Sequence, residues 1–138
     1  MTDNMNICVD GQQYSGGQSD RITLQTSGSL FYKGDAWYVT YFERGEDGRE
    51  TKVTLKLQPN RAVMLRSGTS RMEFSPGSDT LCNYDTGAGI LQMYVRTHAV
   101  NSTLSSTGGH VELIYSLYAE NDLLTKNDVR ISLTPLYE

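Results

Sequence analysis

The sequence predicts a single all-β domain over residues 1–138, folded as an antiparallel up-and-down β-barrel of about eight to ten strands. Apolar residues alternate with polar ones over short runs, where a helix would space them three and four apart. Gly, Asn, Asp and Pro separate these runs, as expected of tight turns. Nine Tyr against one Trp add side chains that suit strands. No connection is long enough for the crossovers that parallel strands need.

The expected strands begin with residues 36–42, where Trp37, Val39 and Tyr41 share one face. Residues 52–57 alternate apolar side chains with Lys and Thr, which is typical of a half-buried strand. The remaining expected strands are 61–66, 70–74, 90–97, 110–118 and 128–134.

Short turns are expected between these strands, and residues 101–107 are expected to form the longest polar loop. The turn segments are 33–35, 45–48, 59–60, 67–68, 76–77, 87–89, 108–109, 121–122 and 127–128. Closure into a barrel removes the two exposed edges of an open sheet. A barrel of about eight strands is either filled by side chains or holds one small ligand. A two-sheet sandwich is the competing architecture, since the same alternation fits both.

Composition and charge limit the classes of partner and cofactor that the protein is expected to bind. The net charge is −4 and the Lys and Arg residues are scattered, which argues against a general nucleic-acid binder. No apolar stretch approaches the length of a membrane span and the N-terminus lacks a signal peptide pattern, so we expect a cytoplasmic protein without a membrane partner. Cys8, Cys82, His98 and His110 lack the spacing of a zinc site, so no metal or other cofactor is expected.

Polar residues continue strand faces that are otherwise apolar. Glu43 follows the face of Trp37, Val39 and Tyr41, and a carboxylate that approaches an apolar interior must pair or reach solvent. We therefore expect Glu43 to meet Arg66 or Arg71 near one mouth of the barrel. The residues that would bind a ligand there are Tyr41, Glu43, Arg66, Arg71, Tyr84, Thr97 and Tyr115.

Two interpretations of this set remain open. The polar groups either line a small-molecule pocket or form a structural ion pair that closes the barrel end, with the tyrosine hydroxyls kept in contact with water. We favour the structural ion pair, because structural pairs perturb their surroundings just as active sites do.

The order of several segments resembles the DUF1934 family of bacterial proteins. The segments are 37–43, 63–68, 71–74, 84–86, 89–91, Thr97 and 109–115, within a stretch of about residues 20 to 134. This resemblance implies a lipocalin-like (calycin) β-barrel and no particular activity, since the family is one of unknown function. Arg44 stands where members of the family often carry a second acidic residue, which disfavours a mechanism based on paired carboxylates.

Three functions are compatible with the sequence. The first is a barrel that binds a small molecule in its lumen or at its mouth. The second is an enzyme that uses Glu43 as general acid or base with Arg66 stabilising negative charge, although no nucleophile motif is present and no catalytic residue is assigned. The third is a non-catalytic protein that forms a homodimer through strand faces or edges.

Overall fold

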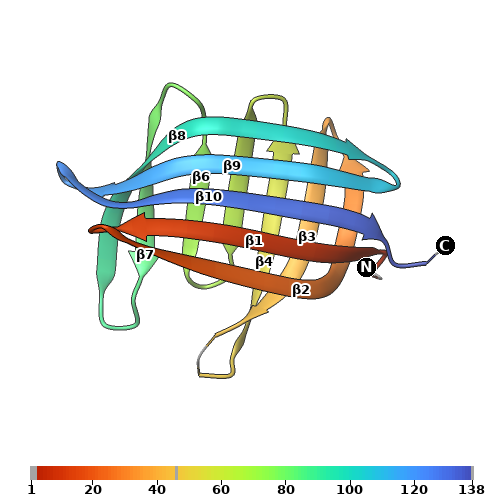
Figure 1. The fold of residues 1–138 in the computed structure, drawn as a ribbon, viewed down its shortest axis with the longest axis horizontal. Coiled ribbons are helices and arrows are strands. Elements are labelled where there is room, and N and C mark those ends of the chain that lie inside the picture. The colour runs from red at the N-terminus through yellow and green to blue at the C-terminus, as the bar shows by residue number, and fades with distance from the viewer. Residues whose placement is uncertain (1–2, 46, 138) are drawn as a thin grey trace.

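The structure is a computed structural model that describes residues 3–45 and 47–137, and these contain ten strands and no helix. Figure 1 shows the strands, which wrap around one interior. Their bounds are β1 Met5–Ser15, β2 Gln18–Lys33, β3 Ala36–Arg44, β4 Glu50–Gln58, β5 Arg61–Arg66, β6 Ser70–Phe74, β7 Asp79–Asp85, β8 Ile90–Ser105, β9 Gly108–Ala119 and β10 Asp122–Pro135.

Every strand pair in the sheet is antiparallel, in the order β6-β5-β4-β3-β2-β1-β10-β9-β8-β7. Strands β6 and β7 meet at a seam that has few bonds. The Asp85 N–H donates to the Thr69 carbonyl at 3.0 Å, and the Thr80 hydroxyl donates to the Glu73 carbonyl at 2.6 Å. The predicted all-β, up-and-down barrel is thus confirmed, as a nearly closed one.

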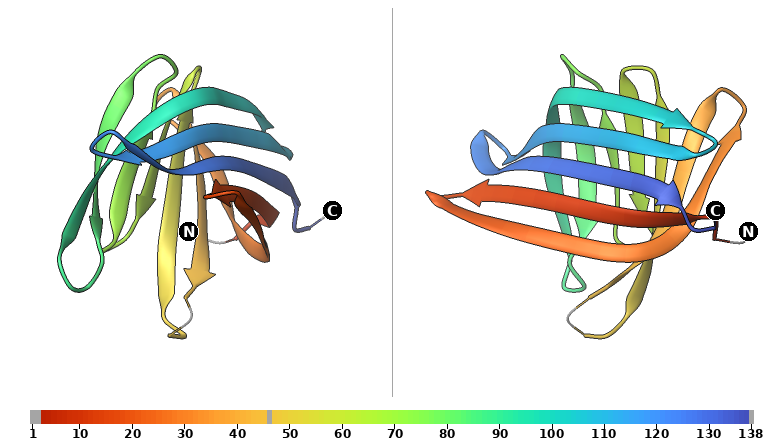
Figure 2. Two further views of the ribbon diagram at one scale, coloured as in Figure 1. Left: turned by 60° about the vertical axis from the view of Figure 1, so that its left-hand side comes forward. Right: turned by 45° about the vertical axis from the view of Figure 1, so that its right-hand side comes forward.

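Strand β2 belongs to both of the layers that cross in Figure 2. Its residues 18–28 pair with β1, and its residues 29–33 pair with β3. The bend falls at Gly28, where a Cβ would collide with the Thr40 carbonyl oxygen and the Ile7 side chain. Glycine is therefore required for this close crossing of β2 over β3.

On the N-terminal side of Gly28, strand β2 diverges from β3 and leaves a wedge in the barrel wall. Among the described residues, 18–27 of β2 have no strand on the side facing β3. Residues 41–44 of β3 likewise pair only with β4. The barrel is therefore open at the end that carries the β1–β2, β3–β4, β5–β6, β7–β8 and β9–β10 turns.

The opposite end of the barrel is filled by apolar side chains. Fully buried there are Ile7, Leu57, Phe74, Val111 and Leu133, which lie near the chain termini and the β2–β3, β4–β5 and β6–β7 turns. Figure 1 shows both termini on this side. The interior is thus packed at this end, and the candidate site lies toward the other end.

Several details differ from the sequence-based expectations. Residues 101–107 do not form a long loop, because β8 continues to Ser105 and pairs with β9. The expected turn at 127–128 lies inside β10. His98 and His110 have separate partners: a ring nitrogen of His98 bonds the Ser116 hydroxyl at 2.9 Å, and His110 faces Ser132 at 3.5 Å. In the described ranges no helix has the length and apolarity to span a membrane.

Candidate functional site

An ion pair between Glu43 and Arg66 stands at the open end of the barrel. Glu43 is the second-last residue of β3, and Arg66 is the last residue of β5. Val53 of β4, which lies between these strands, is opposite Tyr41 on one side and Arg66 on the other. Glu43, two residues after Tyr41, therefore shares the inner face with Arg66. The Arg66 Nε and Nη2 atoms lie 3.3 and 3.4 Å from the two carboxylate oxygens of Glu43. These distances exceed the 2.7–2.9 Å of a tight charged hydrogen bond, so the pair is loosely held.

The guanidinium of Arg66 remains charged in this setting. Burial alone would lower its pKa, but the Glu43 carboxylate outweighs that effect, and the pKa of Arg66 lies above its ordinary value. Both side chains keep about a third of their surface exposed, 28% for Arg66 and 32% for Glu43. The pair is thus reachable by a ligand that enters from the mouth.

Two tyrosines lie beneath the ion pair. Tyr41 is 2% exposed and Tyr115 is 7% exposed. Neither hydroxyl has a hydrogen-bond partner among the described residues, yet no side-chain oxygen in this part of the chain is both fully buried and unbonded. Both hydroxyls therefore border open space. Burial raises the pKa of both phenols, so they stay protonated and can donate hydrogen bonds.

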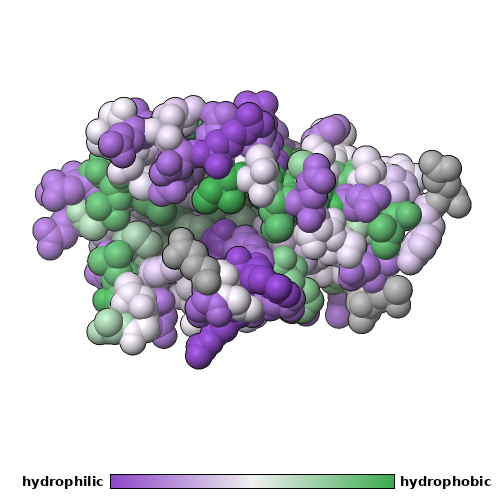
Figure 3. Space-filling model, turned by 60° about the horizontal axis from the view of Figure 1, so that its bottom comes forward, coloured by the Kyte–Doolittle hydropathy of each residue, from purple (hydrophilic) through white to green (hydrophobic). Residues whose placement is uncertain are grey.

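Two adjoining cavities of about 400 and 460 Å³ flank the ion pair. The first lies in the wedge between β2 and β3, with apolar walls from Val9, Ile22, Leu24, Met64 and Val129. The second lies toward the seam, with walls from Met72, Cys82, Met93 and Leu117. The residues common to both are Gln13, Glu43, Arg44, Arg66, Tyr115 and Asn127. Figure 3 shows this face of the molecule, hollowed near its centre with green apolar atoms in the recess.

The arrangement suits an amphipathic ligand. Polar groups from β1, β3, β5, β9 and β10 converge at the centre, and the walls of the first cavity are mostly apolar, as is typical of small-molecule sites. Two phenol hydroxyls and the unused N–H groups of Arg66 are donors, and the Asn127 and Gln13 amides can also accept. In the described ranges no group of three or more His, Cys, Asp and Glu is arranged to hold a metal ion.

The structure brings four of the expected residues together and separates the others. Tyr41, Glu43, Arg66 and Tyr115 share the site, and Tyr84 lies at the exposed rim of the second cavity. Arg71 points outward, because its β6 neighbours Ser70 and Met72 point inward, and it pairs with Glu73 on the surface.

Thr97 points inward but lines neither cavity. It accepts a hydrogen bond from the Ser75 N–H at 3.2 Å and thereby helps to close the seam. Thr97 is thus a structural residue in this fold, and the partner of Glu43 is Arg66.

One wall of the site had no counterpart among the expected residues. Val9, Gln13, Ile22, Leu24 and Asn127 come from β1, β2 and β10, of which the first two were not predicted as strands. The alternation of Ile22, Leu24 and Thr26 with polar residues is the signal that could have shown this wall.

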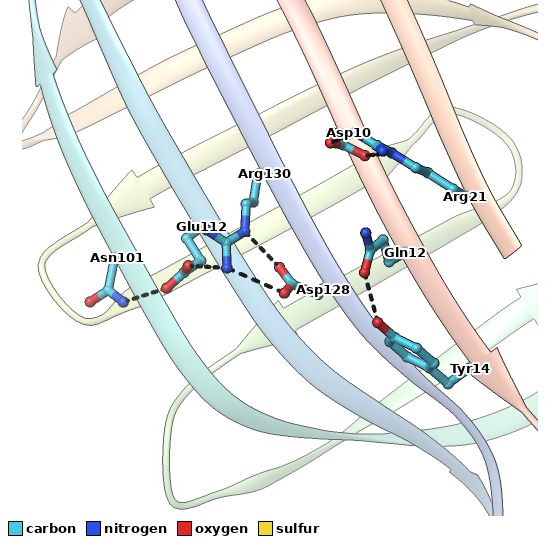
Figure 4. A network of polar contacts seen from close by, with 8 residues as sticks. All are labelled: Asp10, Gln12, Tyr14, Arg21, Asn101, Glu112, Asp128 and Arg130. Carbon is cyan, nitrogen blue, oxygen red and sulfur yellow. Dashed lines mark hydrogen bonds and ion pairs between the residues drawn. The ribbon is translucent and has the colours of Figure 1, made fainter. Parts of the chain in front are cut away.

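A second polar network covers the outer face of β8, β9, β10, β1 and β2 (Figure 4). The guanidinium of Arg130 lies 3.2 Å from the carboxylates of both Glu112 and Asp128. The guanidinium of Arg21 donates two hydrogen bonds to the Asp10 carboxylate. The Arg130–Glu112 and Arg21–Asp10 pairs bridge neighbouring strands and the Arg130–Asp128 pair lies within β10, all on a solvent-exposed face where each contributes little to stability. The network therefore accounts for the polar outer surface and is separate from the site.

Comparison with known proteins agrees with the geometry. The model of the family described as "Domain of unknown function (DUF1934)" matches residues 7–131. The chain belongs to the DUF1934 family. The resemblance noted from ordered segments is thereby confirmed.

One relative supports the fold in both its sequence and its crystal structure. "Uncharacterized beta-barrel protein YwiB" of Bacillus subtilis (strain 168) is 24% identical over 108 residues, which cover 77% of this chain and 75% of that protein. The crystal structure of the ywiB protein from Bacillus subtilis superposes with a TM-score of 0.87, at 20% identity, over 98% of this chain and 93% of that chain. A protein of unknown function from Bacteroides ovatus matches with a TM-score of only 0.33, over 95% of this chain and 41% of that chain at 10% identity. The YwiB comparisons show the barrel and assign no activity.

Proposed function

We propose that this protein binds a small amphipathic molecule in the cavity at the open end of its barrel. The observation that carries the proposal is the pair of hydroxyls on the nearly buried Tyr41 and Tyr115, which border the cavity and have no hydrogen-bond partner among the described residues. Polar groups at the base of such a cavity are normally hydrogen-bonded, so a ligand acceptor at this position would satisfy both. Neighbouring Ile22 and Leu24 would cover the apolar part of the ligand.

A thermal-shift screen against a metabolite panel tests the proposal. A bound ligand stabilises the folded protein by mass action and so raises its melting temperature. The gain in the free energy of unfolding is about 2.7 kcal/mol when the free ligand concentration is a hundred times Kd. The Leu24→Trp variant fills the first cavity and should lose the shift. The matched control is Gln25→Trp, on the outer face of the same strand, which should keep it. Stabilisation that survives Leu24→Trp, or no stabilising compound in wild type, would count against the proposal.

Acid–base catalysis by Glu43 is the second candidate function, because this carboxylate borders both cavities. Both of its oxygens already face Arg66, so abstraction of a substrate proton would require this guanidinium to move aside. Glu43→Gln separates the two functions. A catalyst would lose turnover with ligand affinity nearly unchanged, whereas a binding protein would show changed affinity and no turnover to lose.

A homodimer remains a third candidate. Leu81, Tyr94, Tyr118 and Leu123 occupy adjacent register positions on the outer face of β7 to β10, and the first, second and fourth are exposed. Light scattering of wild type and Tyr94→Lys would detect a dimer that uses this row of residues.

A cytoplasmic location is also part of the proposal. Cys8 and Cys82 are both free thiols, since Cys8 lies on the outer face of β1 and Cys82 points into the barrel. Unpaired thiols are the usual state in a reducing compartment. Neither nucleic acid nor a membrane is proposed as a partner, and the ligand is proposed to bind without a cofactor.

A further inference from the structure

The wedge between β2 and β3 is bordered by free strand edges. On the side facing the wedge, residues 18–27 of β2 and 41–44 of β3 have no backbone hydrogen-bond partner in the described parts of the chain. Alternate residues of a strand point their N–H and C=O groups to one side. About half of the residues along this stretch of β2 therefore offer a donor and an acceptor to the wedge.

Between Ile22 and Thr26 the edge of β2 lacks the features that normally prevent pairing, and the charges of Asp20 and Arg21 lie outside this stretch. Lysine, proline and bulges protect exposed edges in most sheets. The segment from Ile22 to Thr26 has no charge and no proline, and β2 pairs with β1 in unbroken register. Ile22 is 66% exposed although it points toward the cavity. The edge is thus ready to accept another extended chain.

The first cavity lies directly behind this edge. Side chains of an added strand would alternate between solvent and the barrel interior. The inward ones would enter the cavity between Leu24 and Tyr41. Beneath them, the Tyr41 and Tyr115 hydroxyls and the free N–H groups of Arg66 are donors that suit peptide carbonyl oxygens.

We infer that the ligand of this site is a short extended peptide, which adds as a strand to the free edge of β2 and places alternate side chains in the cavity. In this mode main-chain hydrogen bonds supply affinity and the side-chain pocket supplies selectivity. The inference rests on the proposed function, since the peptide occupies the same cavity. The β2 strand of a second copy fits poorly, because its own β1 would then fall in the space of β3.

Backbone NMR of the isotope-labelled protein tests the inference with a defined probe. The probe is a pool of blocked hexapeptides in which Val, Ile, Leu or Thr alternates with Ser or Gln. We expect shifts at the amides of residues 18–27 and slower hydrogen exchange at those that face the wedge. The same peptides methylated on alternate backbone nitrogens lose several hydrogen bonds and should bind at least about tenfold more weakly.

Two variants locate the effect on the edge. Ile22→Lys places a charge on the cavity side of β2 and should abolish peptide binding. Gln25→Lys places the same charge on the outer face and should leave binding intact. Both positions are exposed residues of β2, so the circular dichroism spectra of the two variants should match that of wild type.

Three results would overturn the inference. One is equal binding of methylated and unmethylated peptides, and another is no amide shift at millimolar peptide. The third is a concentration-dependent dimer that Ile22→Lys disrupts, since a second copy of the chain would then pair with the free edge of β2. If one of these three results is obtained while metabolites still stabilise wild type and not Leu24→Trp, the proposed function stands and the peptide inference fails. If neither metabolites nor peptides bind, both fail.

Discussion

At the scale of single residues, the site depends on how Glu43 and Arg66 share charge at the barrel mouth. Arg66 is held over Tyr41 and Tyr115 by two long hydrogen bonds to Glu43. Such a partly exposed pair contributes modestly to stability, but the loss of one partner leaves the other in a poorly solvated position. The two single substitutions should therefore have unequal effects.

Arg66→Met should lower the free energy of unfolding by about 1–2 kcal/mol, because it leaves the Glu43 carboxylate without its donor. Glu43→Gln should cost less than about 1 kcal/mol, since the amide can still accept a hydrogen bond from Arg66. Urea unfolding of both single variants and the double variant measures the coupling. Equal losses, or a coupling near zero, would contradict the ion pair.

The buried phenols predict a response to alkaline pH. Burial raises the pKa of Tyr41 and Tyr115 in the folded protein, whereas the unfolded chain titrates near the ordinary value of 10.0. Stability should therefore be constant below this value and fall as pH rises above it, because only the unfolded chain releases these protons. The Tyr41→Phe/Tyr115→Phe variant should lose less stability than wild type between about pH 9 and about pH 11. Parallel losses in urea unfolding would show that the hydroxyls are not desolvated.

At the scale of the element, the bend of β2 opens the wedge. Gly28→Ala should lower the free energy of unfolding by about 3 kcal/mol, since the new methyl group meets the backbone of β3. Gly11→Ala is the matched control, because its nearest neighbour would be the Ile22 carbonyl at 3.8 Å and φ there is ordinary. Denaturant titration of both variants is the measurement. A Gly28→Ala protein as stable as Gly11→Ala would mean that β2 and β3 do not cross closely.

The same bend explains which strands the sequence could predict. In residues 36–42 and 52–57 the inward side chains are buried, so burial imposes a clear alternation, and both are strands in the structure. Strand β1 and the first half of β2 carry Gly11, Gln13 and polar residues on both faces, because their inner face lines a cavity. Alternation weakens where there is no packed core on one side.

The candidate site shows the same division. The Glu43–Arg66 pair and the two tyrosines were predictable, since charge on an apolar strand face demands a partner. The wall of Ile22 and Leu24 was missed, because its alternation with polar residues is short and the divergence of β2 from β3 leaves no local mark other than Gly28. Arg71 was expected in the site as an alternative partner of Glu43, although Met72 and Phe74 alternate with Arg71 and Glu73 and thus place Arg71 on the outer face.

At the scale of the whole molecule, the barrel has a packed end and a hollow end. We expect native-state hydrogen exchange to divide the amides accordingly, because local opening is easiest where few apolar contacts hold the backbone. The slowest amides should lie around Phe74, Leu113 and Leu133, and the fastest strand amides in residues 18–27 of β2. Uniform protection along β2 would argue against an open wedge.

The most direct test of ligand binding is a crystal structure of the protein bound to a compound from the thermal-shift screen. The account predicts density in the cavity between Ile22 and Tyr115, with a ligand oxygen or nitrogen within hydrogen-bond distance of a tyrosine hydroxyl. The apolar part of the ligand should lie against Leu24 and Val9. A mouth in which both hydroxyls bond Glu43 or Arg66, with the stabilising compound bound elsewhere, would contradict it.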